Sequence, residues 1–409
     1  MVPDEFIPAT QTELSRYIGD NARGAAHPLY PVGGRTSLEY GYPVKEPGIT
    51  LPLSRLTRTI DYPARDMTIT VEAGLRVEEL AAQLRVERQR LPVDIPQAHR
   101  ATLGGAIATN ASGPGRFGHG TLRDYVIGVS GIDASGRLFK AGGRVVKNVA
   151  GYDLCKLMIG SLGTLAVVTQ VTLKLKPLPD SRRLLWCSFG TLGEVDAALE
   201  KLTLSETRPV AIEVLTATAA AQIAAEARAD LPVSSPVLCV AVEGTELDTN
   251  WQAGTLRQEL SAFSPQQMED VVGPATESVW GALTEFQTST EEPVTFKANL
   301  RPSRVCEFLQ RAQERGVALQ SHAGNGIVIG HLPDSITSAQ SAEEILAPLR
   351  QFAREASGNL VILHCDAAWK QTLPVFGVPD RSWTLMQKVK HELDPHDLFN
   401  RGRLFRAAD

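Results

Sequence analysis

Glycines mixed with small hydroxyl and amide side chains are the residues of this chain best suited to hold a charged group. Fourteen glycines lie between residues 101 and 163, whereas the overall content of 34 in 409 predicts about five. The same stretch holds Thr102, Thr109, Asn110 and Ser112, which can hydrogen-bond a phosphate without filling the space around it. Because glycine lets a backbone turn tightly or approach another group closely, the stretch predicts a ligand site, with a set of hairpin turns as the alternative.

A shorter glycine loop lies near the start of the chain. The run from Tyr30 to Ser37 has an apolar entry, a Gly-Gly turn and two hydroxyl residues, and such a turn can aim successive N–H groups at an anion. It lacks the spacing and the lysine of a Walker loop. Within the longer stretch, residues 113–118 match G-x-G-x-x-G, but neither a hydrophobic strand before them nor a helix opening from them is predicted. We therefore expect a loop bounded by loops there and no Rossmann site.

Regular elements flank the glycine-rich stretch and would position it. Residues 68–74 alternate polar and apolar side chains and end at a glycine, which predicts a strand, and apolar residues then recur at helical spacing over 77–84. A second, half-exposed strand is predicted over 170–176, before Pro177. The run 177–182 contains two prolines and an aspartate and predicts a domain boundary.

Beyond this boundary, strands and helices alternate without glycine clustering, which predicts an α+β domain. Helices are expected over 195–202, 217–229, 305–312 and 385–393, and strands over 212–215, 237–242 and 327–329, with another beginning at 318. Lys297 and Arg301 fall on a predicted strand and its exit. They could face a carboxylate, although a solvated strand edge is the simpler interpretation.

Composition and charge exclude several classes of protein. The 409 residues are enough for two domains, and 43% hydrophobic with 21% charged residues is ordinary globular usage. With 41 basic and 46 acidic side chains the net charge is −5, and there is no long basic run, so a nucleic-acid partner is not expected. We find no export signal and no apolar run long enough to span a membrane. The five scattered cysteines fit reduced thiols in a cytoplasmic chain without its own Cys-based zinc or iron–sulfur site.

Four segments in a fixed order resemble one flavoprotein family. They are the loop around Gly33 and Gly34, the run 102–113, the run 148–154 and the run 160–169. The family contains vanillyl-alcohol oxidase, D-lactate dehydrogenase and glycolate oxidase, and its FAD domain is named after p-cresol methylhydroxylase (PCMH). The resemblance covers nearly the whole chain, and the run Lys147 to Leu154 is most similar to the FAD-binding E subunits of bacterial glycolate oxidase (glycolate dehydrogenase).

The resemblance implies an α+β fold with a two-subdomain PCMH-type FAD-binding domain over residues 1–178. An α+β substrate or cap domain would follow over 179–380, and a C-terminal helix and tail over 381–409 would pack back on the FAD domain and return to the flavin. The pyrophosphate of an extended FAD would be held by backbone N–H groups. The first loop has Arg35 and Thr36 where members with covalent flavin often place a histidine, so we expect non-covalent FAD.

The cofactor-binding residues that the resemblance implies fall into several groups. The pyrophosphate would lie on Pro31, Val32, Gly33, Gly34, Arg35, Thr36, Ser37, Thr102, Leu103, Gly104 and Gly105. The ribityl and isoalloxazine side would be lined by Asn110, Ser112, Gly113, Gly118 and Gly120, and the adenosine or flavin edge by Gly163, Thr164 and Val168, with Pro96 also included. The tail 394–404 resembles the family's closing segment and adds Asn400 and Gly402, with a helix stop and turn as the alternative.

The substrate half of the family usually carries a strand whose two histidines, with a later acidic residue, hold a divalent metal. Residues 321–329 resemble this strand, and His322 matches the first histidine. Ile329 stands at the second position and Asn325 replaces an aspartate, so we expect no metal site. His322 and Lys297 remain weak catalytic candidates, and a structural role for His322 is the favoured interpretation.

The resemblance also implies a function and partners. We expect an FAD-binding subunit of a glycolate oxidase complex, which oxidises glycolate to glyoxylate and passes electrons through flavin to an iron–sulfur subunit beside a larger flavoprotein subunit. The complex would attach peripherally to the inner membrane. Because the base and metal residues are altered, the chain could relay electrons while a partner performs the chemistry. The alternatives are a stand-alone FAD-dependent D-2-hydroxy-acid (D-lactate) dehydrogenase and a flavin-free structural subunit.

Overall fold

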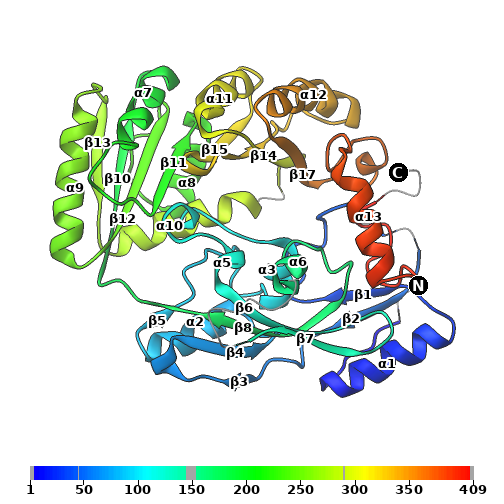
Figure 1. Ribbon diagram of the computed structural model, residues 1–409. Helices are drawn as coiled ribbons and strands as arrows, with labels where there is room; N and C mark the ends of the chain where they lie inside the picture. The colour runs from blue at the N-terminus through cyan, green and yellow to red at the C-terminus, as the bar shows by residue number, and fades with distance from the viewer. Residues whose placement is uncertain (1–3, 45, 144–152, 289–290, 406–409) are drawn as a thin grey trace. The chain divides into compact units, whose positions relative to one another are not determined.

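The computed structural model describes residues 4–44, 46–143, 153–288 and 291–405, and the chain divides into two compact units (Figure 1). The first unit consists of Met1–Ser112, Thr121–Leu178 and Val378–Asp409, and the second of Gly113–Gly120 and Pro179–Gly377. Each unit has its own main β-sheet. Most of the run 147–154, which carries the resemblance to the E subunits, falls outside the described residues.

The first unit is built on a five-stranded antiparallel sheet in the order β3-β4-β8-β6-β7. Its strands are β3 (Thr59–Asp61), β4 (Thr68–Glu72), β6 (Val126–Ile132), β7 (Leu138–Gly142) and β8 (Val167–Lys174). Two parallel strands, β1 (Leu29–Val32) and β2 (Ile49–Pro52), form a second sheet, and β5 (Gln89–Arg90) pairs with β9 (Lys176–Pro177). Along β8, buried and half-buried residues alternate, as the sequence predicts for a strand with one partly solvated face.

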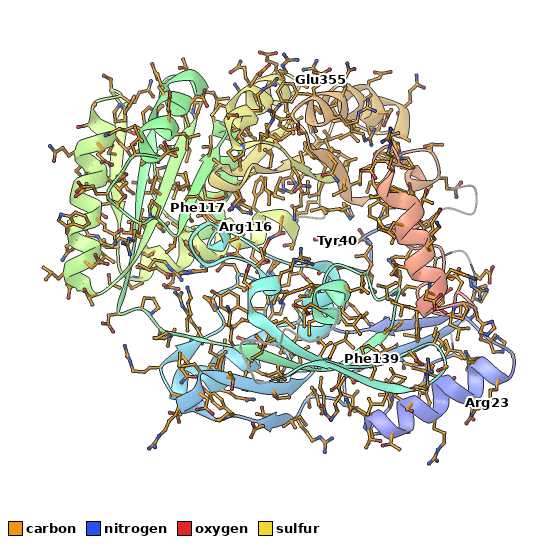
Figure 2. All side chains as sticks on the ribbon, in the orientation of Figure 1. Arg23, Tyr40, Arg116, Phe117, Phe139 and Glu355 are labelled. Carbon is orange, nitrogen blue, oxygen red and sulfur yellow. The ribbon has the colours of Figure 1, made fainter. Side chains whose placement is uncertain are left out.

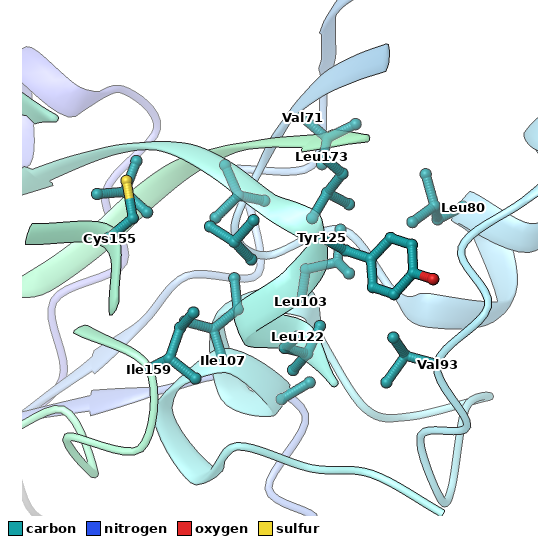
Figure 3. Packing of buried hydrophobic residues seen from close by; sticks show 14 of the residues in the cluster. Val71, Leu80, Val93, Leu103, Ile107, Leu122, Tyr125, Cys155, Ile159 and Leu173 are labelled. Atoms are coloured by element: carbon teal, nitrogen blue, oxygen red, sulfur yellow. The ribbon is translucent and has the colours of Figure 1, made fainter. Parts of the chain in front are cut away.

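Helices cover this sheet and close its core. They are α1 (Gln11–Arg23), α2 (Val77–Val86), α3 (Leu103–Thr109), α5 (Leu122–Tyr125), α6 (Leu154–Met158) and α13 (Ser382–Leu393). The core cluster joins α2 and α3 to the sheet through Val71, Leu80, Leu103, Ile107 and Leu173, all of them buried (Figure 3). Burying these side chains together fixes the position of α3. Gly104 and Gly105, which the sequence analysis expects to contact a cofactor, are thereby fixed as well.

Helix α3 forms although it contains two adjacent glycines, which disfavour helices. Thr102 caps it, since its hydroxyl accepts a hydrogen bond from the N–H of Gly105 at 3.3 Å. A side chain at Gly104 would press against Ala73 on the neighbouring chain segment. The glycine therefore allows close packing of the helix at this point.

The C-terminal tail is part of the first unit. Its residue Phe399 is fully buried and bridges to Leu29 at the start of β1. The N–H of Leu29 donates to Leu398 at 2.7 Å and the N–H of Asn400 donates to Leu29 at 3.0 Å. The buried carboxylate of Asp394 accepts from the N–H groups of Leu398 and Phe399 and so fixes the turn after α13. The tail thus runs beside the strand that leads into the first glycine loop.

The second unit is built on an eight-stranded antiparallel sheet in the order β13-β10-β12-β11-β15-β16-β14-β17. Its strands are β10 (Ser181–Ser188), β11 (Ala211–Leu215), β12 (Val237–Gly244), β13 (Gln267–Val271), β14 (Val294–Asn299), β15 (Ala318–His322), β16 (Ile327–His331) and β17 (Asn359–Cys365). Its longer helices are α7 (Leu192–Leu202), α8 (Ala217–Ala227), α9 (Glu246–Ser261), α10 (Pro274–Glu285), α11 (Val305–Gln313) and α12 (Ala339–Glu355). The strands and helices expected from periodicity are present, with ends displaced by a few residues.

The segment Gly113–Gly120 leaves the first unit in sequence and packs in the second. It contains the short helix α4 (Arg116–His119), and helices α3 and α5 flank it, so the expectation of a loop bounded by loops was wrong. No strand precedes it, in agreement with the rejected Rossmann match. The N–H of Gly118 donates to Val210 at 3.0 Å, and a side chain there would collide with the Val210 backbone. The packing of this segment on β11 depends on contacts far away in sequence.

Among the helices of the described ranges, none is long and apolar enough to cross a bilayer.

Candidate functional site

Two adjoining cavities of the first unit bring the glycine loop and α3 together. The first is lined by Pro31–Ser37, Leu38, Tyr40, Gly105, Ala108, Thr109, Leu162, Asn400 and Arg403. The second is lined by Pro31, Val32, Gly33, Leu53, Thr102, Gly104, Gly105, Ala108, Met158, Ser161–Gly163, Ala166–Val168 and Asn400. Backbone, hydroxyl and small apolar groups dominate both walls.

The structure places most of the sequence-predicted cofactor residues on these walls, but not all. All seven residues of the first loop line a cavity, as do Thr102, Gly104, Gly105, Gly163, Val168 and Asn400. Pro96, Leu103, Asn110, Ser112, Thr164 and Gly402 lie in the first unit outside these linings, and the side chain of Leu103 is in the core. Gly113, Gly118 and Gly120 are in the second unit.

The first loop requires glycine because another chain segment crosses it. A Cβ at Gly33 would collide with the hydroxyl of Thr102, and one at Gly34 with the backbone carbonyl of Arg100. Arg35 follows in the left-handed region at φ 59°. The loop is therefore held against the N-terminal end of α3, and its residues Pro31–Ser37 line the first cavity.

Asn400 connects the tail to both cavities. Its amide donates to the carbonyl of Leu162 at 2.8 Å, and a side chain at Gly163 would press on that amide. Gly163 itself is left-handed, at φ 64°. The tail residue thereby fixes the turn 160–163, which forms one wall of the second cavity.

The chemistry of these walls fits an anionic dinucleotide. Neither wall contains an aspartate or glutamate among the described residues. Burial raises the pKa of Tyr40 to about 12, which keeps its phenol neutral as a potential donor to a ligand. Asn110 lies outside both linings. It caps α3 at φ 53° and keeps a buried Oδ1 without a hydrogen-bond partner in the described chain, an acceptor that the donor of a ligand or a water would satisfy.

Arg403 is a charged residue of this site that the sequence analysis does not name as a cofactor contact. It lies in the closing segment beside Asn400 and lines the first cavity. Its side chain donates to the carbonyls of Leu38 and Tyr40, and its own carbonyl accepts from Tyr42 at 2.9 Å. The available sequence signal is its place in the closing segment, directly after the expected contact Gly402.

In the second unit, one face of the large sheet gathers polar side chains. Strand pairing places Glu213, His322, Ile327 and Asn299 in one row across β11, β15, β16 and β14. Nδ1 of His322 lies 2.8 Å from Oε1 of Glu213, and both residues are buried. Because a carboxylate only accepts, Nδ1 carries the proton and Nε2 is left as the basic nitrogen. No described residue hydrogen-bonds Nε2.

A second row on the same face runs from Gln320 through Ile329 to Lys297. The amide of Gln320 donates to Glu213 at 2.7 Å and so gives that carboxylate a second donor. Lys297 lies on β14, which has β16 and β17 on its two sides. The expectation of a solvated strand edge at Lys297 was therefore wrong. Two strands and two residues separate it from His322, roughly 12 Å between Cα atoms.

Lys297 has an unusual electrostatic environment. Burial, and then the nearby positive charge of Arg116, lower the pKa of its ammonium group from 10.5 to about 8. Arg116 and its neighbour Phe117 come from α4 (Figure 2). The ring of Phe117 packs against Gly324. The segment 113–120 therefore brings a second cation to the face that carries Lys297.

The family's metal-binding pattern is not reproduced on this face. Ile329, at the position of the second histidine, is buried opposite Lys297. His331, two residues further, has Nδ1 3.2 Å from Thr295 Oγ1 and Nε2 2.9 Å from the carbonyl of Phe286. In the part of the chain that the structure describes, three or more His, Cys, Asp or Glu side chains nowhere group in a way that could hold a metal.

Comparison with known families identifies both parts of the chain. Residues 5–142 match the family described as FAD binding domain, and residues 178–404 match the C-terminal domain of FAD linked oxidases. The solved structure of p-cresol methylhydroxylase with bound substrate superposes with a TM-score of 0.73 at 15% identity, covering 98% of this chain and 88% of that one. The predicted PCMH-type fold is confirmed.

Two relatives align with nearly the whole chain, and a third aligns with less than half of it. D-2-hydroxyglutarate dehydrogenase of Xanthomonas citri pv. viticola is 30% identical, over 95% of this chain and 86% of that protein. Glycolate oxidase subunit GlcD of Bacillus subtilis is 23% identical, over 99% and 89%. Glycolate oxidase subunit GlcE of Escherichia coli is 37% identical, but over 43% of this chain and 48% of that protein.

Proposed function

Because the chain belongs to the family of FAD-linked oxidases and is an FAD-dependent oxidoreductase, we propose that it oxidises a small 2-hydroxy acid. We further propose that it does so as a subunit of a glycolate oxidase type of complex, with a larger flavoprotein and an iron–sulfur subunit as partners. The names of the relatives support this choice, since two are glycolate oxidase subunits and one acts on a hydroxy acid.

The observation that carries the proposal is the pair of cations on the second unit's sheet. Burial and the positive charge of Arg116 both lower the pKa of Lys297, and an anion that arrives beside Lys297 would lower the cost of its charge. A 2-hydroxy acid brings a carboxylate, which would be held by these cations. Ile329, opposite Lys297, gives the same place an apolar neighbour.

The hydroxyl group of such an acid needs a base, and His322 is placed to be one. Glu213 fixes its ring and tautomer, which leaves Nε2 to accept the hydroxyl proton. FAD, when bound, supplies the acceptor for the hydride. The proposal thus gives His322 a chemical role, where the sequence favoured a structural one.

The first test is the absorption of the purified single chain at about 450 nm, where bound oxidised flavin absorbs. Glycolate, D-lactate and D-2-hydroxyglutarate are added in turn without oxygen. We expect bleaching by at least one of them, and we expect Lys297→Met to lose it with its flavin content unchanged. A flavin that no hydroxy acid reduces would contradict the proposal.

A second candidate is electron transfer within the complex, with the chemistry in a partner subunit. It is favoured by Ile329 and Asn325 at positions where the family has metal-site residues, and by the 37% identity to GlcE. In that case the flavin of the single chain stays oxidised with every acid, and it becomes reduced when the partner flavoprotein and substrate are added. A chain that takes up no FAD after reconstitution would instead be a structural subunit.

A further inference from the structure

Arg403 is a partly buried cation that lacks a carboxylate partner. Its hydrogen bonds go to two backbone carbonyls, those of Leu38 and Tyr40. Within the described ranges it forms no ion pair. Carbonyl groups satisfy the N–H donors but do not neutralise the charge, so burial of this guanidinium is unfavourable without an anion.

The neighbouring arginines show what is unusual about Arg403. Arg401, two residues earlier, pairs with Glu46 at 2.8 Å. Arg35 also lines the first cavity, but its guanidinium is half exposed and lies 3.5 Å from Glu5. Burial lowers the pKa of Arg403 below its ordinary value, which is the direction expected for a cation that has lost water and gained no counter-charge.

The position of Arg403 indicates where its counter-charge would come from. It shares the wall of the first cavity with the Gly33–Ser37 loop, whose backbone suits an anion. The part of FAD with permanent negative charge is the pyrophosphate. A reduced flavin ring can also be anionic. FAD therefore offers two groups that could supply the counter-charge for Arg403, the pyrophosphate and the reduced ring.

We propose that Arg403 is a cofactor-binding residue, which neutralises the pyrophosphate of FAD and at the same time holds the loop 38–42 over the cavity. The inference depends on FAD binding and is independent of the identity of the substrate. The fork of the guanidinium serves both purposes: one nitrogen donates to the loop carbonyls, and the others remain available to the phosphate oxygens.

The test is the affinity of the flavin-stripped chain for oxidised FAD, measured by flavin fluorescence. We expect Arg403→Met to weaken binding about 10- to 100-fold, since a charge-assisted hydrogen bond is lost. Arg403→Lys keeps the charge and is expected to fall between Met and wild type. Arg401→Met is the matched control, because this arginine lies in the same turn but has its own carboxylates and is absent from both cavity walls.

Two further measurements separate charge from loop structure and from the flavin ring. Salt weakens FAD binding through screening, and we expect this dependence to be smaller in Arg403→Met but preserved in Arg403→Lys. Equal salt dependence in all variants would mean that Arg403 acts through the loop alone and would overturn the proposal. So would an unchanged affinity together with a more negative flavin potential, which would place the charge at the reduced ring. Thermal unfolding confirms that each variant is folded.

Discussion

The carboxylate of Glu213 lies 2.8 Å from Nδ1 of His322 on the neighbouring strand, and both side chains are buried. A histidine held in this way has a fixed ring and a defined basic nitrogen. The same carboxylate accepts from Gln320, so the amide also helps to hold it in place. Under the proposed function, this pair supplies the base, and Glu213 orients it without a metal ligand.

Removal of either member of this pair should slow reduction of the flavin. We expect His322→Gln to lower the rate about 100-fold or more, because a general base typically contributes that much. Glu213→Gln should lower the rate less, because the imidazole of His322 is retained and only loses the carboxylate that orients it. Anaerobic stopped-flow absorbance with the hydroxy acid that reduces the wild-type flavin measures both. Unchanged rates at equal substrate affinity would return His322 to a structural role.

Lys297 should lower the stability of the folded protein near neutral pH. Its folded pKa of about 8 lies below the ordinary 10.5, so between these values the unfolded chain binds more protons and stability rises with pH. Lys297→Met should therefore stabilise the protein by about 1–3 kcal/mol at pH 7, with the gain shrinking as the pH approaches 10. Thermal unfolding at pH 7 and 9.5 measures this. A variant that is less stable at pH 7 would mean that the lysine contributes to packing instead.

The first glycine loop should not tolerate a methyl group. Gly34→Ala would push the loop away from the carbonyl of Arg100, so we expect FAD affinity to fall at least 10-fold, because a displaced backbone loses several anion contacts. Gly281→Ala, in α10, is the control, since no atom of the described residues lies within 4 Å of a Cβ built there. Titration with FAD followed by fluorescence compares the two variants. Equal affinities would show that the loop can shift without loss.

Glu243 should be important for the stability of the second unit. It is buried, lies 2.9 Å from Nε2 of His119 and 2.7 Å from the guanidinium of Arg182, and so joins α4 to the sheet. Its removal leaves the largely buried guanidinium of Arg182 with only the exposed Glu277 as a counter-charge, and we expect Glu243→Gln to cost about 2–4 kcal/mol. Glu277, which is 72% exposed and 3.4 Å from the same arginine, should cost under about 0.5 kcal/mol as Glu277→Gln. Urea unfolding measures the stability of both variants, and equal losses would contradict the special importance of Glu243.

Sequence reasoning was most successful where chemistry and spacing are local. The loop 31–37 and the capped start of α3 could be found because glycine, hydroxyl and turn preferences act within a few residues. Helices and strands followed from periodicity, which depends on one buried face.

Sequence reasoning failed where the outcome depends on contacts far away in sequence. Lys297 was assigned to a strand edge because pairing with β17 cannot be read from β14 alone. The position of Glu213 beside His322 depends on strand register, which cannot be read from the residues next to either one in the sequence. The position of Arg403 in the cavity wall depends on the loop at Leu38 and Tyr40, which lies at the other end of the sequence.

The division of the chain has a consequence for synthesis on the ribosome. The first unit includes Val378–Asp409, which is translated after the whole of Pro179–Gly377. Until that tail emerges, β1 lacks the backbone partner at Phe399 and the core lacks two large buried side chains. The second unit holds all of its segments earlier. We therefore expect the second unit to be completed before the first during synthesis, because the first unit lacks α13 and the tail until the end of the chain is translated.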